Sequence, residues 1–418
     1  MITINKSKIK LVIYLFFFIF APPLIPRISI IHILTAGSLL YMLLYWRTSL
    51  KLFYRQRNIK AFFTLFLIYL LYIVSRMAYS IIVNPVNADN YVNTLYKFFM
   101  VVIEIPICCA FIIIYCNKKS YSFDELLKMI VWTGIIQVVI GGLMIVSPSI
   151  KYSLVSFMQR NNGSSISDIV PWEYNRRYNA ISDCMLDMLG WGLGIISALP
   201  LYLKGKKRYM YLLCIPFLVV ITVANSTTGI IMFAILAVIA ILGKIKKISN
   251  NKVIIIGVSF LVAIGAVIAM KYIVPSTYDW TVNEIKAILG MNTEKVSSFS
   301  KVMSSDFRIF PEQIIELVFG TGHTIYSVSG FAHSDLGYIN HIWLGGLFGT
   351  IGIYFIYFIL FKAGFKKQRK AIVLSLAIAM YIFELKGFGI CYNPGMALTM
   401  LLVFDVIIVE KKYECDAK

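Results

Sequence analysis

A polar, glycine-punctuated loop at 319–338 holds the side chains best suited to acid–base chemistry. It reads FGTGHTIYSVSGFAHSDLGY and leads into an apolar stretch that begins at Ile339. Two of its residues are histidines, His323 and His333, and a neutral imidazole is a natural acceptor of a proton near neutral pH. Anchoring a membrane segment does not require a loop this polar. We therefore interpret it as a functional site.

Arginines lie where they can bind an anion. Arg176 and Arg177 occur in YNRRYNAISD at 174–183, and Arg308 precedes the polar loop. A guanidinium grips phosphate oxygens through two hydrogen bonds and stabilises the charge that grows on a leaving group. Arg76 lies inside an apolar stretch, where a charge is costly and indicates function. Arg177, Arg308 and Arg76 are the candidate ligands, whereas Arg176 also fits a solvated loop residue.

The composition is that of an integral membrane protein. Of the 418 residues, 59% are hydrophobic and 14% are charged, and the mean hydropathy is +0.79. Apolar runs long enough to cross about 30 Å of hydrocarbon recur along the chain. We expect an all-α polytopic protein, one transmembrane domain over 1–418, with about twelve helices. The predicted spans are 11–25, 28–46, 61–83, 94–116, 126–147, 185–203, 209–224, 227–243, 253–273, 337–363, 371–387 and 395–409.

The basic residues predict the orientation of these spans. Of the 40 Lys and Arg, 27 fall in segments that share one side of the membrane under this topology. That side is then cytoplasmic and holds both termini. Two long segments, 148–184 and 274–336, lie on the opposite side. The net charge of +20 thus reports topology and does not indicate a nucleic-acid partner.

Other charges within the predicted spans have two interpretations. Lys97 and Lys386, like Arg76, fall in the outer half of the membrane, at the depth of an anionic lipid headgroup. Alternatively, Glu104 pairs with Lys97 or Arg76, and Glu384 pairs with Lys386 at a helix end.

Several classes of site have no support in the sequence. Cytoplasmic connections are too short for a nucleotide-binding domain, and neither a Walker-type loop nor an Asp-x-Asp motif occurs. The seven cysteines lie mostly inside predicted spans and show no metal-ligand spacing with histidine. We therefore expect neither a metal nor another cofactor.

An amphipathic helix is predicted in the second long segment. Apolar residues recur there at helical spacing, with Glu312 and Glu316 between them. The predicted helix begins after an N-cap at Asp306 and stops at Gly320. Its apolar residues are Phe307, Phe310, Ile314, Ile315 and Val318.

The two long segments together resemble those of bacterial O-antigen polymerases and, more distantly, O-antigen ligases. The matching features are an Arg-aromatic-x-small motif at 177–180, Arg308 followed by a helix and Gly-x-Gly at 320–322, and HSDLGY at 333–338 before a glycine-rich span. Ala180 departs from the glycine that is more usual in the first motif. The resemblance implies an architecture like that of the GT-C glycosyltransferases and selects His333 as the catalytic histidine.

The same resemblance implies roles for the remaining residues. Asp335 orients His333 or binds sugar hydroxyls, although Ser334 and Asp335 also fit a helix cap, and Tyr338 ends the motif at the substrate. The implied reaction polymerises undecaprenyl-diphosphate-linked oligosaccharides at the periplasmic face of the bacterial inner membrane, without a metal, and releases undecaprenyl diphosphate. Donor and acceptor are then both membrane lipids, and a chain-length regulator is a further implied partner. The rival functions are an O-antigen ligase and a lipid-linked oligosaccharide flippase, but the two long segments and the outer-half cations argue against a flippase.

The predicted orientation is testable by cysteine labelling. Cysteines introduced at Ser167 and Ser297, in the two long segments, should react with a membrane-impermeant thiol reagent in intact spheroplasts, because both segments lie opposite most of the basic residues. A cysteine at Lys206, on the basic side, is the matched control and should react only after lysis. The reverse pattern would invert the topology.

Overall fold

The protein is mainly helical. The computed structural model describes residues 6–25, 28–47, 56–161 except 84 and 87, 186–243 except 206 and 207, 275–290 except 289, 308–325 and 334–416, with Tyr174, Tyr178, Ser182 and five residues between 257 and 272. Helices account for most of this part, which confirms the all-α class. Within it, the only strands are β1 (Pro23–Ile25) and β2 (Ile28–Ser29), which pair antiparallel.

The chain divides into two compact units. Unit 1 comprises residues 1–42, 110–292 and 393–398, and unit 2 comprises 43–109, 293–392 and 399–418. Unit 1 contains α1 (Lys6–Phe20), most of α2 (Ile30–Leu44) and of α6 (Ile105–Lys118), α7 (Phe123–Val146), α8 (Pro148–Asn161), α10 (Leu186–Tyr202), α11 (Arg208–Leu212), α12 (Ile215–Asn225), α13 (Thr227–Leu242) and α15 (Pro275–Ile288).

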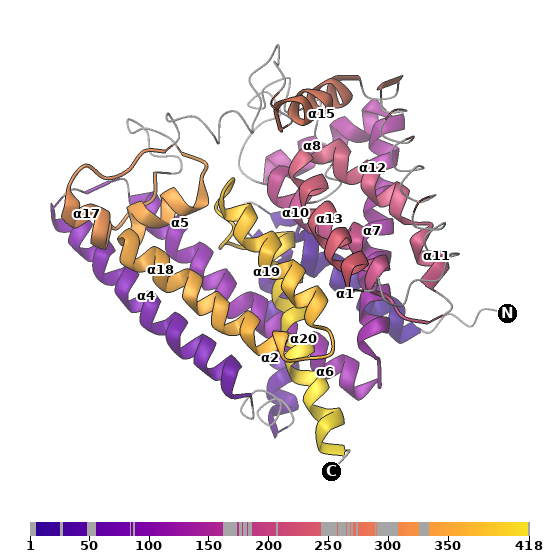
Figure 1. Ribbon diagram of the computed structural model, residues 1–418, viewed down its shortest axis with the longest axis horizontal. Coiled ribbons are helices and arrows are strands. Elements are labelled where there is room, and N and C mark those ends of the chain that lie inside the picture. Colours follow the sequence, from indigo (N-terminus) through magenta and orange to yellow (C-terminus); the bar gives the residue numbers. More distant parts are fainter. Residues whose placement is uncertain are drawn as a thin grey trace. The chain divides into compact units, whose positions relative to one another are not determined.

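Unit 2 contains α4 (Arg57–Val83), α5 (Ala88–Phe99), the π-helix η1 (Met100–Glu104), α17 (Ile314–Phe319), α18 (Gly337–Phe365) and α19 (Lys370–Glu384). The last helix, α20 (Pro394–Asp416), begins in unit 1 and continues in unit 2. Figure 1 labels these elements along the chain.

Five stretches are long and apolar enough to cross a membrane. They are α4, the continuous stretch Ala88–Lys118, α7, Arg208–Asn225 and α18. Four more apolar helices are shorter: Ile30–Leu44, Leu186–Tyr202, Thr227–Leu242 and Pro394–Ile408. Helices lie at each predicted span except 253–273, which falls almost wholly outside the described residues. The helical, membrane-compatible class is confirmed, and the number of crossings stays a prediction.

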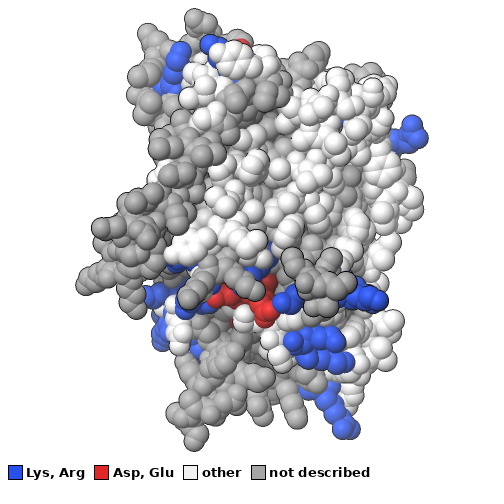
Figure 2. Space-filling view, turned by 90° about the vertical axis from the view of Figure 1, so that its right-hand side faces the viewer, with Lys and Arg blue, Asp and Glu red and all other residues white. Residues whose placement is uncertain are grey.

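Surface charge on one face agrees with this class. Figure 2 shows a broad area without blue or red side chains, and Lys and Arg gather elsewhere on that face around a small acidic group. A charged side chain in hydrocarbon costs several kcal/mol, so an extended uncharged surface suits contact with lipid.

Prolines separate the first two helices, as the sequence predicts. The helix α1 ends at Phe20, and the chain passes through the β1–β2 ladder before α2 begins at Ile30. Proline lacks the backbone N–H that a continuing helix needs. Pro22 and Pro23 therefore end the first span.

Glycines allow the helices of unit 1 to pack closely. A Cβ atom at Gly190 or Gly194 of α10 would collide with α13, and one at Gly192 would collide with Pro394. Small residues let helix backbones approach, which is how membrane helices gain contact without a hydrophobic driving force. The helix α10 is accordingly buried on all sides from Leu189 to Tyr202.

Aromatic rings form the core of unit 2. The helices α4 and α18 lie side by side (Figure 1), and Phe62 and Phe66 of α4 meet Tyr357 of α18 edge to face. Phe98 and Phe404 complete the cluster. Gly345 and Gly349 face α4 at Tyr72, so these glycines form a helix-packing face.

The helix α18 is two helices joined at Gly346. This residue has φ 67° and ψ −173°, outside the helical region. In a straight α-helix residues 341 and 354 would lie about 20 Å apart along the axis, yet the rings of His341 and Tyr354 have centroids 5.8 Å apart. The chain therefore folds back at Gly346. The part from 347 to 365 is about 28 Å long, enough for one crossing. The predicted span 337–363 therefore lies on one apolar stretch, but with a break at Gly346 that the sequence analysis does not predict.

Thr321 of the polar loop and Tyr72 of α4 provide hydrogen-bond donors for the backbone carbonyls at this break. Thr321 donates its N–H to the carbonyl of Trp343 (2.6 Å), and its hydroxyl donates to the same oxygen (2.8 Å). The Tyr72 hydroxyl lies 2.9 Å from the carbonyl oxygen of Gly345 and 2.8 Å from that of Phe319 and can donate to one at a time. The carbonyls freed by the break thus keep hydrogen-bond partners, as a low-dielectric environment requires.

The amphipathic helix is shorter than predicted. The helix α17 begins at Ile314 after the N-cap position Gln313, and residues 308–313 are not helical. Pro311 explains this, because a proline disfavours the helical conformation of the residue before it. The start after Asp306 is therefore wrong, whereas the stop is confirmed at Gly320, which has φ 81°.

Gly346→Ala should destabilise the protein by at least about 2 kcal/mol. Its conformation is one that only glycine adopts readily, and a Cβ atom there would collide with the carbonyl group of Val318. Thermal unfolding in detergent would show the loss as a lower melting temperature. Gly352→Ala in the same helix is the control, since its Cβ meets only Tyr69 at ordinary contact distance. Equal melting temperatures for the two variants would contradict the break.

Candidate functional site

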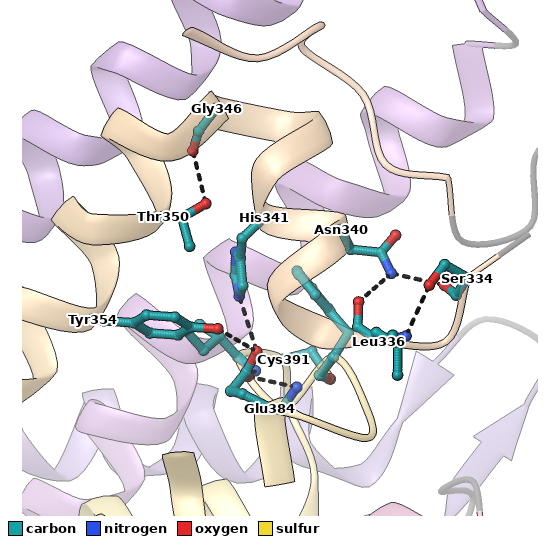
Figure 3. Close-up of polar contacts among 12 residues, drawn as sticks. Ser334, Leu336, Asn340, His341, Gly346, Thr350, Tyr354, Glu384 and Cys391 are labelled. Carbon is teal, nitrogen blue, oxygen red and sulfur yellow. Dashed lines mark hydrogen bonds and ion pairs between the residues drawn. The ribbon is translucent and has the colours of Figure 1, made fainter. Parts of the chain in front are cut away.

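A buried histidine and a buried glutamate meet where α18 folds back. Nε2 of His341 lies 3.3 Å from Oε2 of Glu384, and the two side chains are 0% and 2% exposed. Tyr354, on the second part of α18, donates its hydroxyl to the same oxygen at 3.3 Å. Figure 3 shows His341 and Tyr354 converging on Glu384 from the two parts of α18. The fold-back at Gly346 is what brings these three residues together.

The Glu384 carboxylate is held by backbone amides as well. Its Oε1 atom accepts hydrogen bonds from the N–H groups of Gly389 (2.8 Å) and Ile390 (3.0 Å), just beyond the end of α19. Gly337, the first residue of α18, lies so close that a Cβ atom there would collide with this carboxylate. The glycine of the HSDLGY motif therefore makes room for Glu384. The alternative pairing with Lys386 is not among the contacts of Glu384.

The His341 ring is held by its neighbours and makes no hydrogen bond to the part of the chain that the structure describes. Phe388 packs against it with centroids 4.7 Å apart, and Tyr354 meets it edge-on. The approach to Glu384 is an ion-pair contact without hydrogen-bond geometry, and Nδ1 has no partner among the described residues. Lys97 of α5 lies with its amine 5.6 Å from the same Phe388 ring. A proton acceptor, its carboxylate and a cation thus occupy one region of unit 2.

The predictions for the residues just before α18 are tested only in part. His333 lies outside the described residues. The N-cap position of α18 is Leu336, without a side-chain cap, so neither Ser334 nor Asp335 is the cap residue. Ser334 instead accepts a hydrogen bond from the N–H of Leu336 (3.3 Å), and Asp335 is exposed.

Tyr338 belongs to a small apolar cluster rather than to the His341 site. It is partly buried against Ile325, Leu336 and Ile339. Nearby, Asn340 donates to the carbonyls of Ser334 (2.8 Å) and Leu336 (2.9 Å), as Figure 3 shows. These contacts fix the start of α18, and the substrate-binding role of Tyr338 stays a prediction.

Arg76 binds the polar loop. Its Nη2 donates to the carbonyl of Gly320 at 2.6 Å, and the guanidinium lies 4.4 Å from the ring centroid of Tyr79. Gly322 has φ 86°, and a Cβ atom there would collide with the backbone of Arg76. Nε is buried without a hydrogen bond in the described part of the chain. Arg76 therefore holds the polar loop against α4.

His323 is a buried loop residue. Its Nδ1 lies 3.4 Å from the hydroxyl of Ser80, and its ring lies beside Trp343. Burial lowers the pKa of His323 from 6.5 to about 4, because the charged imidazolium loses its hydration, although a backbone hydrogen bond at Thr321 opposes the shift. His323 is therefore neutral near pH 7 and packs as part of the fold.

The first long segment is anchored within unit 1. The N–H of Tyr178 donates to Oδ1 of Asn225 (3.1 Å), and Nδ2 of Asn225 donates to the carbonyl of Tyr178 (3.2 Å). The amine of Lys151 lies 3.9 Å from the ring centroid of Tyr178 and 4.9 Å from that of Tyr174. Burial lowers the pKa of Lys151 to about 8. Tyr174 and Tyr178, which flank residues 175–177 in the chain, therefore have fixed positions.

The predicted arginine ligands are described only in part. Arg176 and Arg177 lie outside the described residues. Arg308 is exposed, next to Ile309, whose carbonyl accepts a hydrogen bond from the Trp343 indole (2.8 Å). Arg308 and Arg76 both belong to unit 2. Their roles as phosphate ligands remain predictions.

Sequence reasoning missed the pairing of His341 with Glu384. His341 falls inside the predicted span 337–363, and for Glu384 the sequence leaves open a pairing with Lys386 or a functional charge. The signal that could have found the site is the pair Gly345 and Gly346, four and five residues after His341, since adjacent glycines in a membrane helix mark a place where it can break.

Comparisons with known proteins do not assign this chain to a family. No protein-family model matches this chain, and no curated protein matches it. The functional argument therefore depends on the residues and their geometry.

The neutral state of His323 predicts an acid sensitivity. Between pH 6.5 and about 4 the unfolded chain binds a proton at this residue that the folded protein does not. Stability should therefore fall as the pH falls through this window, by about 3 kcal/mol from this group. Urea unfolding at pH 7 and pH 4.5 measures the loss.

His323→Phe keeps a ring at this position and removes the titration. The variant should lose less stability than the wild type over the same pH interval. An identical acid-dependent loss in both proteins would show that His323 is not buried in its neutral form.

Proposed function

We propose that this protein is a membrane glycosyltransferase that polymerises undecaprenyl-diphosphate-linked oligosaccharide repeats, of the O-antigen kind, at the periplasmic face of a bacterial inner membrane. The observation that carries the proposal is the buried contact between His341 and Glu384 in the unit that also holds Arg76 and Lys97. A proton acceptor supported by a carboxylate, together with cations, suits transfer of a sugar from a diphosphate to a hydroxyl group.

The reaction needs charge stabilisation on its donor side. Negative charge grows on the diphosphate as the glycosidic C–O bond breaks, and arginine and lysine side chains stabilise that charge. The proposed ligands are Arg177 and Arg308, from the motifs that resemble those of O-antigen polymerases, and Arg76, whose Nε has no hydrogen bond among the described residues. Arg176 and Tyr338 are proposed to contact the substrate beside them.

On the acceptor side a sugar hydroxyl loses its proton as its oxygen attacks. Two histidines are proposed bases. His333 follows from the resemblance, with Asp335 beside it, and His341 follows from its contact with Glu384. Because His341 is fully buried, an acceptor that reaches it must part the rings of Phe388 and Tyr354. The proposed chemistry uses no metal.

The product made by a deletion strain tests the proposal. Loss of this protein should leave lipopolysaccharide capped with a single repeat unit, visible as one band in place of a ladder on a gel. Expression of the wild-type protein should restore the ladder. Long polymer that is not attached to lipid A core would indicate a ligase instead, and cytoplasmic accumulation of lipid-linked repeats would indicate a flippase.

Variants in the same strain separate the proposed roles. Arg177→Lys and Arg308→Lys keep the charge but lose the paired hydrogen bonds, so polymer length should drop sharply. Loss of the general base should lower the rate about 100- to 10,000-fold. Each of the single variants His333→Ala and His341→Ala should therefore abolish the ladder. Ladders of normal length from all four variants would contradict the proposal.

A further inference from the structure

We propose that Glu384 is a positioning residue for His341: it holds the Nε2 side of the ring, so that Nδ1 is the nitrogen that accepts the proton of the acceptor hydroxyl. This inference rests on the proposed function and deepens it. Neither the sequence pattern nor the resemblance assigns a role in catalysis to Glu384.

Glu384 is a hydrogen-bond acceptor that its neighbours hold in place. Two backbone N–H groups, from Gly389 and Ile390, donate to Oε1, and the Tyr354 hydroxyl donates to Oε2. An ionised carboxylate accepts hydrogen bonds and donates none, and these three donors offset part of the cost of burying it. They also prevent it from rotating away from His341.

The charge of Glu384 bears on which nitrogen of His341 carries the hydrogen. The Glu384 carboxylate lies 3.3 Å from Nε2 in a contact without hydrogen-bond geometry, and its negative charge favours the ring form with the hydrogen on Nε2, the nitrogen that faces it. In the neutral ring Nδ1 then carries the lone pair. Nδ1 has no partner among the described residues, and Phe388 and Tyr354 hold the plane of the ring. The glutamate thus selects which nitrogen is basic.

His341 then takes the proton of the acceptor hydroxyl. The O–H bond of the acceptor sugar breaks and an N–H bond forms at Nδ1, while the oxygen forms a bond to the anomeric carbon of the donor. The bond from that carbon to the diphosphate oxygen breaks, and its electron pair leaves with undecaprenyl diphosphate. His341 is then an imidazolium beside an anion, which stabilises the charge, and it returns the proton to water or to the released diphosphate.

The test uses two substitutions of Glu384. A purely structural role and a positioning role predict opposite orders of activity for the two variants. Glu384→Gln keeps the length and an acceptor oxygen but loses the charge, and its amide N–H₂ can donate to Nε2 and place the hydrogen on Nδ1. Glu384→Asp is shorter but keeps the charge. With purified protein and lipid-linked repeats, we expect Glu384→Gln to lower kcat about 100-fold or more, with KM nearly unchanged, and Glu384→Asp to retain more activity.

Matched controls separate chemistry from folding. Asp405→Asn removes another buried acid of unit 2 and should leave the rate unchanged. In the His341→Gln background, adding Glu384→Gln should cost little further activity, because Glu384 acts through His341. This double variant keeps the inference falsifiable if the single variant is unstable.

The outcomes are distinguishable. A Glu384→Gln protein that is more active than Glu384→Asp, with rates that follow the melting temperatures, would show that Glu384 only packs. Wild-type rates from Glu384→Gln would overturn this inference and leave the polymerase proposal standing. A wild-type protein that makes no polymer from lipid-linked repeats would overturn the proposed function, and the role of Glu384 with it.

Discussion

The geometry of unit 2 depends on the need to satisfy every backbone polar group where a membrane helix breaks. At Gly346 the chain leaves the helical conformation, and the carbonyls of Trp343 and Gly345 lose their helical partners. Unpaired, each would cost several kcal/mol in hydrocarbon. Thr321 and Tyr72 supply donors for them. The break is therefore stable only while the polar loop stays docked, and the docking of the loop depends in turn on the break.

This mutual dependence fixes the site. Without the fold-back at Gly346, His341 and Tyr354 would lie about 20 Å apart along one helix and could not share a carboxylate. With it, both reach Glu384. The carboxylate can remain buried because the turn after α19 supplies two N–H donors. Several fixed donors therefore hold the buried Glu384 carboxylate in one orientation.

The sequence predicts the helices well and the site poorly, for a physical reason. Apolar runs and prolines are local signals, so the start of α2 after Pro22, Pro23 and Pro26 was predictable. The stop of α17 at Gly320 is local as well. The contact of His341 with Glu384 joins residues 43 positions apart and depends on a turn inside an apolar run. Apolar composition is the same on both sides of that turn, so hydropathy cannot reveal it.

Both units use the same device to hold an irregular segment against a helix. In unit 1 the side-chain amide of Asn225 pairs with the N–H and the carbonyl of Tyr178, and in unit 2 that of Asn90 pairs with those of Thr324 at 2.9 and 3.3 Å. An asparagine side chain carries the same donor and acceptor as a peptide group, so it satisfies both backbone groups of one residue. One such pair therefore holds the backbone of Tyr178 against Asn225 in unit 1 and that of Thr324 against Asn90 in unit 2.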